Sequence, residues 1–371
     1  MLRLNNKVRH YLYNSRTGNL KAEAVGVVSG EKHFPVFPGN MIFKPLTKSK
    51  PFSTPLYAYA EVFWSAVINE YFMPAPQYEL ATCQGYEAVN EKYYDYGTAV
   101  PVAYGEGESL LNLLEFFRKH PDPKVNIDNY VNYCQMFYDY RDIFGSAYFQ
   151  ENQDMAEQLA MQVLISVLKG DQNYHYENVA FLCDKDGEIV SLAPMIDHEF
   201  STYFMFPDDA SRHVYWLMEL SKSIRGWEVQ PGEYDNFKNP EERELMEKSA
   251  TCINRNLLYI KEHYPQVTSE FLKKMDRLKK DLTEDPKAFF LEGNPEYPDQ
   301  ADSDSWLIGK SRYKDKDEKK AEEYEIKFRN TAKKIDFHDV NISAVNEIRS
   351  VIGQIEEVLG KREQRNKQTV S

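Results

Sequence analysis

The sequence contains little cysteine and no long apolar segment. Its four cysteines, Cys83, Cys134, Cys183 and Cys252, are scattered over 371 residues without a CxxC pair, so the chain should fold without disulfide staples. No stretch approaches the ~18 uncharged apolar residues of a membrane span, and nothing near Met1 resembles the apolar core of a secretion signal. We therefore expect a soluble protein of the reducing cytoplasm, with no membrane partner.

Positive charge is also in short supply. The 45 Lys and Arg residues are outnumbered by 58 Asp and Glu residues, which gives a formal net charge of -13. Such a field repels nucleic-acid backbones, so direct nucleic-acid binding is disfavoured. Any small anionic ligand would need a locally positive pocket or a metal ion. What the chain does have is 42% hydrophobic and 14% aromatic residues, enough to bury the cores of two lobes.

The first hundred residues show mainly strand patterns. Val8–Tyr13 and Leu20–Val28 alternate or run apolar around the polar stretch Ser15–Asn19, which predicts a hairpin with a polar tip. Met41–Lys44 is a further predicted strand. The helical run from about Leu56 to Tyr71 should stop before a Met-Pro pair, because the residue before proline disfavours the α conformation.

A lobe boundary is predicted near residue 105. The strand-like segment Thr98–Tyr104 ends there, and Ser109 is placed to cap an apolar helix over Leu110–Phe117. Most of the following chain has helical spacing. The expected fold class is α+β, with a small antiparallel β-rich lobe over residues 1–104, a larger mainly α-helical lobe over 105–312, and charged helices over 313–371.

One helix delivers the chain into a polar loop. Asp154–Lys169 has apolar residues at helical spacing, and Gly170 is well placed to end it. The loop runs to Asn178 and is followed by two short apolar runs around Asp184–Gly187, whose Asp-Gly pair favours a tight hairpin turn. The second run leads to Asp197, so the hairpin should bring Asn178 and Asp197 together.

These positions suit phosphoryl transfer, which needs a cation on the phosphates and oxygen ligands for Mg²⁺. Lys44 ends a strand, and Glu61 on the next helix is spaced to hold it, with Glu70 a weaker substitute. A solvated lysine and an exposed glutamate are the alternatives. Asn178 and Asp197 are candidate Mg²⁺ ligands, whereas a single Asn or Asp in a turn is more often a turn former.

Three motifs resemble the HipA-type kinases, which have a bilobal protein-kinase-like fold. Gly170–Asn178 is similar to their G-x-x-D-x-H-x-x-N catalytic loop, Leu192–Asp197 to their L-A-P-x-x-D metal motif, and Met41–Pro45 more loosely to the strand of their nucleotide lysine. The resemblance covers roughly residues 8–230. It implies ATP and Mg²⁺ as cofactors. In that case Lys44 would contact the ATP phosphates, Asn178 and Asp197 would bind Mg²⁺, and His175 would organise the catalytic loop.

One position departs from that pattern. Where the family has the Asp that accepts the hydroxyl proton, this chain has Asn173, and a neutral amide is a poor proton acceptor. Asp171 would supply a carboxylate if the loop were shifted, or it caps the loop after the helix end. The sequence leaves open an active kinase and a nucleotide-binding pseudokinase or scaffold.

The resemblance implies further roles that the residues alone do not establish. Backbone amides at Ser15 and Gly18 would cradle phosphate, although an ordinary exposed hairpin fits equally well, and Val102 to Tyr104 would read the adenine edge. The acceptor would be Ser or Thr of a protein substrate or of the chain itself, at Ser15 or Thr17. An antitoxin-like partner is compatible with the family. Because little chain precedes Val8, a compact form without the family's extra N-terminal subdomain is expected.

Overall fold

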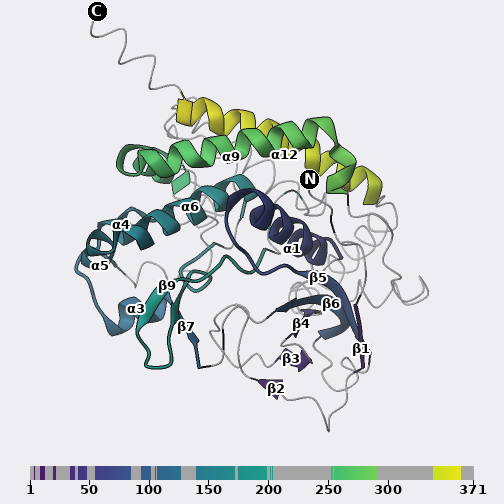
Figure 1. Cartoon of the computed structure of the whole chain (residues 1–371), viewed down its shortest axis with the longest axis horizontal. Coiled ribbons are helices and arrows are strands. Elements are labelled where there is room, and N and C mark those ends of the chain that lie inside the picture. Colours follow the sequence, from purple (N-terminus) through teal and green to yellow (C-terminus); the bar gives the residue numbers. More distant parts are fainter. Residues whose placement is uncertain are drawn as a thin grey trace, which may run out of the picture.

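The computed structural model describes Leu4 and residues 9–12, 20–21, 34–37, 41–47, 55–84, 93–101, 105, 107–126, 139–171, 174–198, 201, 203, 252–253, 255–290 and 337–360. These residues form a mixed α+β structure, which confirms the predicted fold class. The two sheets lie on one side of the molecule, the long helices α9 and α12 on the other, and α6 beneath those helices (Figure 1).

The larger sheet has six strands in the order β1-β5-β6-β4-β3-β2. Four of its five pairings are antiparallel, and the edge strand β1 runs parallel to β5. Its central strands β5, β6 and β4 carry residues that are almost wholly buried. The strands are β1 Arg9–Leu12, β2 Leu20–Lys21, β3 Phe34–Phe37, β4 Met41–Thr47, β5 Glu79–Gln84 and β6 Tyr93–Pro101.

The predicted hairpin of the first two strands is wrong. β1 pairs with β5 and β2 pairs with β3, so the two strands lie at opposite edges of the sheet. Strands that follow one another in the sequence often pair, but the pairing also depends on which strand edges the rest of the sheet leaves available. Residues 15–19, the expected hairpin tip, lie outside the described residues.

Helix α1, Pro55–Val67, packs against β5 and β6. Its sequence is apolar nearly all round, as expected of a buried helix, and Trp64 and Ala60 are wholly buried. The helix continues as the π-helical turn η1, Ile68–Phe72, and the chain turns extended at Met73. The predicted stop before Pro74 is therefore confirmed.

The smaller sheet shows a second departure from the sequence prediction. Ser109–Asn112 is not the start of a helix but strand β7, which pairs with β8, Ala180–Cys183, and through it with β9, Ile189–Leu192. Helix α3, Leu113–Lys119, begins only after Asn112, whose side-chain oxygen accepts from the amide of Glu115 at 2.6 Å. Pairing with the edge of β8 keeps residues 109–112 extended, and the Asn112 cap starts the helix at Leu113.

Helix α6, Gln153–Lys169, runs through the centre of the helical part (Figure 1). Gly170 ends it with φ 59°, a left-handed conformation that favours glycine, and the amide of Asp171 bonds the carbonyl of Ser166 at 3.0 Å in a Schellman-type closure. Other helices are α4 Arg141–Gly145, α5 Ala147–Glu151, α9 Pro265–Glu284, η5 Pro286–Phe289 and α12 Phe337–Gly360. Residues 252–253 and 255–263 are also helical.

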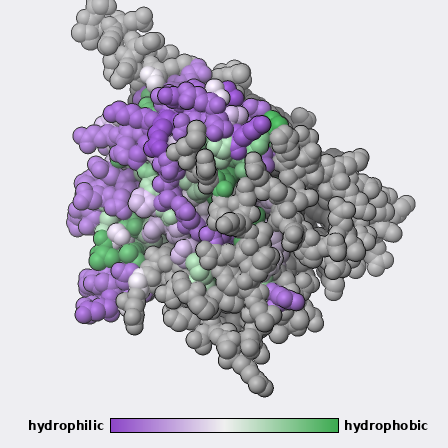
Figure 2. Space-filling model, turned by 45° about the vertical axis from the view of Figure 1, so that its right-hand side comes forward, coloured by the Kyte–Doolittle hydropathy of each residue, from purple (hydrophilic) through white to green (hydrophobic). Residues whose placement is uncertain are grey.

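Helices α9 and α12 pack on each other and on α6. α9 also contacts η1, where the Tyr71 hydroxyl donates to Asp281 at 2.7 Å and Arg277 lies over the Tyr71 ring. The α1–η1 segment is thus fixed to the helical part as well as to the sheet. On the face seen in Figure 2, hydrophilic side chains cover most of the described surface. No helix among the described residues is long and apolar enough to cross a membrane.

Candidate functional site

Strand β4 directs Lys44 toward helix α1. Phe43 lies in a small core cluster on the other face of the sheet, whereas Ile42 joins the main core, which also contains most of α1. Alternation along the strand therefore puts Lys44 on the α1 face. Its ammonium contacts the Oε1 atom of Glu61 and the Oδ1 atom of Asp197. One lysine thus joins the sheet, a helix and a segment 153 residues further along the chain.

The β8–β9 ribbon brings the two candidate metal ligands together. The turn between the strands is closed by Asp184, whose side chain accepts from the amides of Asp186 and Glu188 at 2.9 and 3.0 Å. At the open end of the ribbon, Asn178 precedes β8 and Asp197 follows β9. The Nδ2 atom of Asn178 lies 3.4 Å from Oδ2 of Asp197.

Asp197 has an unusual backbone conformation. Its φ of 61° is left-handed, and it is the one non-glycine residue with positive φ among the described residues. Such a conformation costs about 1–2 kcal/mol and persists where the surroundings hold it. The Asp197 amide donates to the Tyr78 hydroxyl at 3.3 Å, and the next amide, of His198, donates to Oε2 of Glu61 at 3.1 Å. Glu61 therefore holds both Lys44 and the backbone that follows Asp197.

A buried polar group lies behind this backbone. Lys169, at the end of α6, is wholly buried, and its Nζ atom lies 2.6 Å from Oδ2 of Asp171 and 2.9 Å from Nδ1 of His198. Burial, reinforced by the Lys169 charge, holds the pKa of His198 well below its usual 6.5. His198 is therefore neutral at physiological pH, and its Nδ1 atom accepts a hydrogen bond from the Lys169 ammonium.

His175 organises the loop before the ribbon. Its Nδ1 atom accepts from the amide of Glu177 at 3.2 Å, and its carbonyl accepts from the amide of Asn178 at 2.8 Å. Burial lowers the pKa of His175 below 6.5, although the charge of Glu177 opposes the shift. A neutral imidazole that accepts a backbone hydrogen bond fits the organising role that the family resemblance implies.

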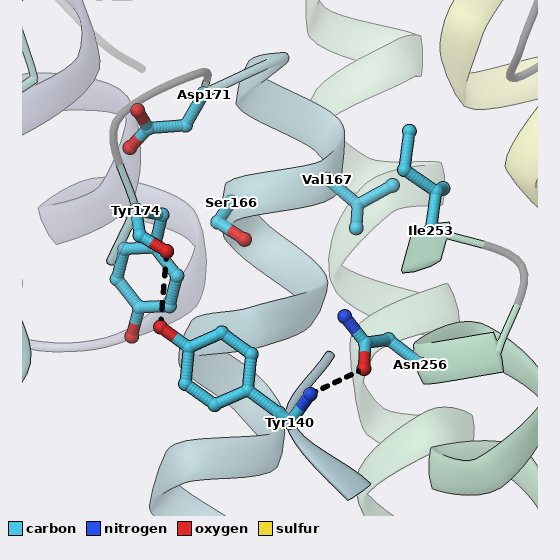
Figure 3. A pocket seen from close by; sticks show the side chains of 7 residues that line it. All are labelled: Tyr140, Ser166, Val167, Asp171, Tyr174, Ile253 and Asn256. Atoms are coloured by element: carbon cyan, nitrogen blue, oxygen red, sulfur yellow. Dashed lines mark hydrogen bonds between the residues drawn. The ribbon is translucent and has the colours of Figure 1, made fainter. Parts of the chain in front are cut away.

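Asp171 lies on the α6 side of the same loop. Its carboxylate is 2% exposed and paired with Lys169. Figure 3 shows it at the rim of a small pocket beside the last turn of α6, lined also by Tyr140, Ser166, Tyr174 and Asn256. The pocket has room for about one water molecule. This environment favours the structural role of Asp171, because a buried carboxylate engaged by an ammonium is poorly placed to meet a large substrate.

The donor set fits a magnesium ion. A carboxylate and an amide oxygen are hard ligands, and Mg²⁺ commonly takes one or two such groups together with phosphate and water. Asp197 is 16% exposed, so it is accessible to a ligand. The described residues contain no cluster of three or more His, Cys, Asp or Glu side chains arranged to hold a metal, so the phosphates and water would complete the coordination at the two-ligand pair.

The structure thus brings Lys44, Glu61, Asn178 and Asp197 into one site. Glu70, the weaker substitute for Glu61, instead pairs with Arg277 of α9 at 2.6 Å. The remaining predicted site residues lie outside the described residues and stay predictions: Asn173, Ser15, Gly18, Val102 and Tyr104.

Sequence reasoning missed Tyr78, Lys169 and His198. Nothing around Tyr78 indicates that its hydroxyl meets a backbone amide more than a hundred residues away. For Lys169 a signal existed: residues 163–168 are nearly all apolar, so the end of α6 is buried on every side, and any charge there requires a partner.

Comparison with known proteins identifies a distant structural similarity. No protein-family model and no curated protein sequence matches this chain. Among solved structures, this chain is similar to a proinflammatory kinase from Helicobacter pylori, CtkA. The match covers 73% of this chain and 87% of the CtkA chain, with 16% sequence identity and a TM-score of 0.38. Membership of the HipA-type family therefore stays a prediction from the motifs.

Proposed function

We propose that the chain is an ATP- and Mg²⁺-dependent phosphotransferase of the HipA-like type. The observation that carries this proposal is the contact of the Lys44 ammonium with Glu61 on one side and Asp197 on the other. Phosphoryl transfer is catalysed mainly by positioning and charge. A lysine from a sheet, held by a helical glutamate next to an Asp–Asn pair, supplies a phosphate-binding cation and metal ligands at one place.

Each residue has a distinct task in this proposal. Glu61 orients Lys44, whose ammonium binds the phosphate oxygens of ATP. Asn178, through its amide oxygen, and Asp197 hold Mg²⁺, which when bound neutralises charge on the phosphates. The acceptor is a Ser or Thr hydroxyl of a protein substrate or of the chain itself, and an antitoxin-like protein remains a candidate partner.

A second candidate function is a nucleotide-binding pseudokinase. The residue in the position of the family's catalytic Asp is Asn173, and the nearby Asp171 is buried against Lys169. If neither side chain accepts the hydroxyl proton, the chain binds MgATP but transfers phosphate slowly or not at all. A loose transition state tolerates the loss of a base, so slow transfer is the expected result for the wild type.

Binding is tested by thermal unfolding with ATP, with and without Mg²⁺. A ligand that binds the folded state at 100 times its Kd stabilises it by about 2.7 kcal/mol, and we expect a Mg²⁺-dependent part of this gain in the wild type. Asp197→Ala should lose that part. Asp186→Ala, on the exposed turn of the same ribbon, removes the same charge and should keep it. Equal behaviour of the two variants would refute the assignment.

Turnover separates the two candidate functions. Transfer of the γ-phosphate of ATP to protein, followed by phosphoamino-acid analysis, should show phosphoserine or phosphothreonine that is absent in Asp197→Ala. Asn173→Asp should raise the rate by about 10²-fold or more, the usual contribution of a positioned base. Wild-type binding without turnover, restored by Asn173→Asp, identifies a pseudokinase. Absence of MgATP binding by the wild type refutes both.

A further inference from the structure

Lys169 is the most deeply buried charge among the described side chains near the site. Its side chain is 0% exposed, yet its Nζ atom has two partners, Asp171 Oδ2 at 2.6 Å and His198 Nδ1 at 2.9 Å. One partner begins the polar loop and the other directly follows Asp197. The ammonium therefore bridges the two segments that carry the candidate metal ligands.

Stability alone is a poor explanation for this lysine. Desolvating an ammonium costs several kcal/mol, and replacing a buried ion pair by apolar residues of similar volume is often neutral or stabilising. The preceding residues Val167 and Leu168 are also buried, so an apolar side chain at position 169 would suit the surroundings. What an apolar side chain would not supply is a directional link between two separate segments.

The backbone of Lys169 provides a second link to the same region. Its carbonyl accepts from the Ser201 hydroxyl at 2.9 Å, and that hydroxyl accepts from the indole N–H of Trp64 in α1 at 2.7 Å. The side chain and the carbonyl of one residue thus hold both ends of segment 198–201. The carboxylate of Glu61, also on α1, holds the amide of His198.

We propose that Lys169 is a positioning residue that clamps His198 and thereby keeps Asp197 in its left-handed conformation, facing Lys44 and Asn178. A non-glycine residue at φ 61° needs such restraint on the residues that flank it. Only the consequence for metal binding rests on the proposed function, because the clamp itself is a property of the ligand-free chain.

A matched pair of variants at His198 tests the clamp. In His198→Asn the amide oxygen lies near the position of Nδ1 and can accept from Lys169, whereas His198→Leu fills the space without an acceptor. The first measurement is hydrogen–deuterium exchange of the amides of residues 195–201 without ligand. We expect the leucine variant to exchange about tenfold faster there, relative to the rest of the chain, and the asparagine variant to stay close to the wild type.

The second measurement is the Mg²⁺ concentration that gives half of the ATP-dependent stabilisation. It should rise about tenfold in the leucine variant, which corresponds to about 1.4 kcal/mol, while stabilisation by ATP in the presence of EDTA stays unchanged. A general loss of stability would instead weaken both the Mg²⁺-dependent stabilisation and the stabilisation by ATP in EDTA. Lys169→Met, which keeps an unbranched side chain but lacks the ammonium, replaces the leucine variant if that variant does not fold.

The outcomes distinguish the clamp from the function. Equal exchange of residues 195–201 in the asparagine and leucine variants would overturn the clamp, whatever the ligand results. Equal Mg²⁺ half-saturation despite faster exchange would overturn its role in positioning the metal ligand. A wild type that binds no MgATP would refute the proposed function, and the exchange experiment would still decide whether Lys169 restrains Asp197.

Discussion

Substituting Glu61 by glutamine removes the charge on which two segments of the site converge. The Glu61 side chain is 2% exposed; one oxygen contacts the Lys44 ammonium and the other accepts from the His198 amide at 3.1 Å. Glutamine has one oxygen and one NH₂ group, so it satisfies one of these donors and presents a donor to the other. The shape of the side chain is nearly unchanged, which isolates the electrostatic contribution.

The expected loss follows from the burial and from the remaining partner. A hydrogen bond to a charged group contributes about 1.5–3 kcal/mol, and Lys44 keeps Asp197 as a partner. We therefore expect Glu61→Gln to lower the free energy of unfolding by about 2–3 kcal/mol. Glu61→Ala removes the carboxylate acceptor from the Lys44 ammonium and from the His198 amide. It should cost about 3–5 kcal/mol, the range for breaking a buried ion pair.

Urea denaturation measures this loss, with the slope of unfolding free energy against urea expected to stay unchanged. Glu70→Gln is the control, because it makes the same substitution in the adjoining η1 turn. Its partner Arg277 is 54% exposed, so the control should lose less than about 1 kcal/mol. If the Glu61 and Glu70 variants are equally stable, the buried network around Glu61 does not contribute as proposed.

Three further predictions concern residues around the site. Gly97→Ala would place a Cβ atom 2.8 Å from the Cα atom of Pro45, so β4 must shift; thermal unfolding should show a loss of at least about 3 kcal/mol, and wild-type stability would contradict this close approach. Because the folded-state pKa values of His175 and His198 are lowered, the unfolded chain binds more protons below about pH 6.5. The contribution of the two histidines to the free energy of unfolding should therefore be complete above that pH. It should fall as the pH drops toward the folded-state pKa values, by up to about 1.4 kcal/mol per pH unit for each histidine. A urea midpoint that stays constant between pH 7 and 5 would contradict this prediction. Tyr71→Phe removes the hydroxyl hydrogen bond to the Asp281 carboxylate of α9 and should cost about 1.5–3 kcal/mol in urea unfolding, whereas an unchanged midpoint would show that the bond contributes nothing.

Local signals in the sequence predicted the parts of the site that short segments determine. The apolar spacing of residues 154–169 and the glycine at 170 indicated a buried helix that ends at Gly170, and the structure has this helix, with Gly170 in a left-handed conformation. The Asp-Gly turn predicted the ribbon, and a ribbon of two short strands brings the residues at its open end together. The meeting of Asn178 and Asp197 thus follows from about twenty consecutive residues.

Pairing between distant segments was decided only by the tertiary structure. β1 and β2 read as a hairpin, yet they lie at opposite edges of the sheet because β5 and β3 are their partners. The sequence predicted that Ser109 caps a helix beginning at Leu110, yet residues 109–112 pair with β8 as a strand. In both places the local preference is weak, and hydrogen bonding with a remote strand outweighs it.

The sequence by itself determined the types of side chain and their order: a strand lysine, a helical glutamate, and two oxygen ligands on either side of a ribbon. The spacing in the sequence already favoured Glu61 over Glu70 as the partner of Lys44, whereas only the tertiary structure placed Lys169 behind Asp197. The physical reason is that burial and contact between remote segments depend on how whole elements pack, and a charge gains its role from the partners that packing provides.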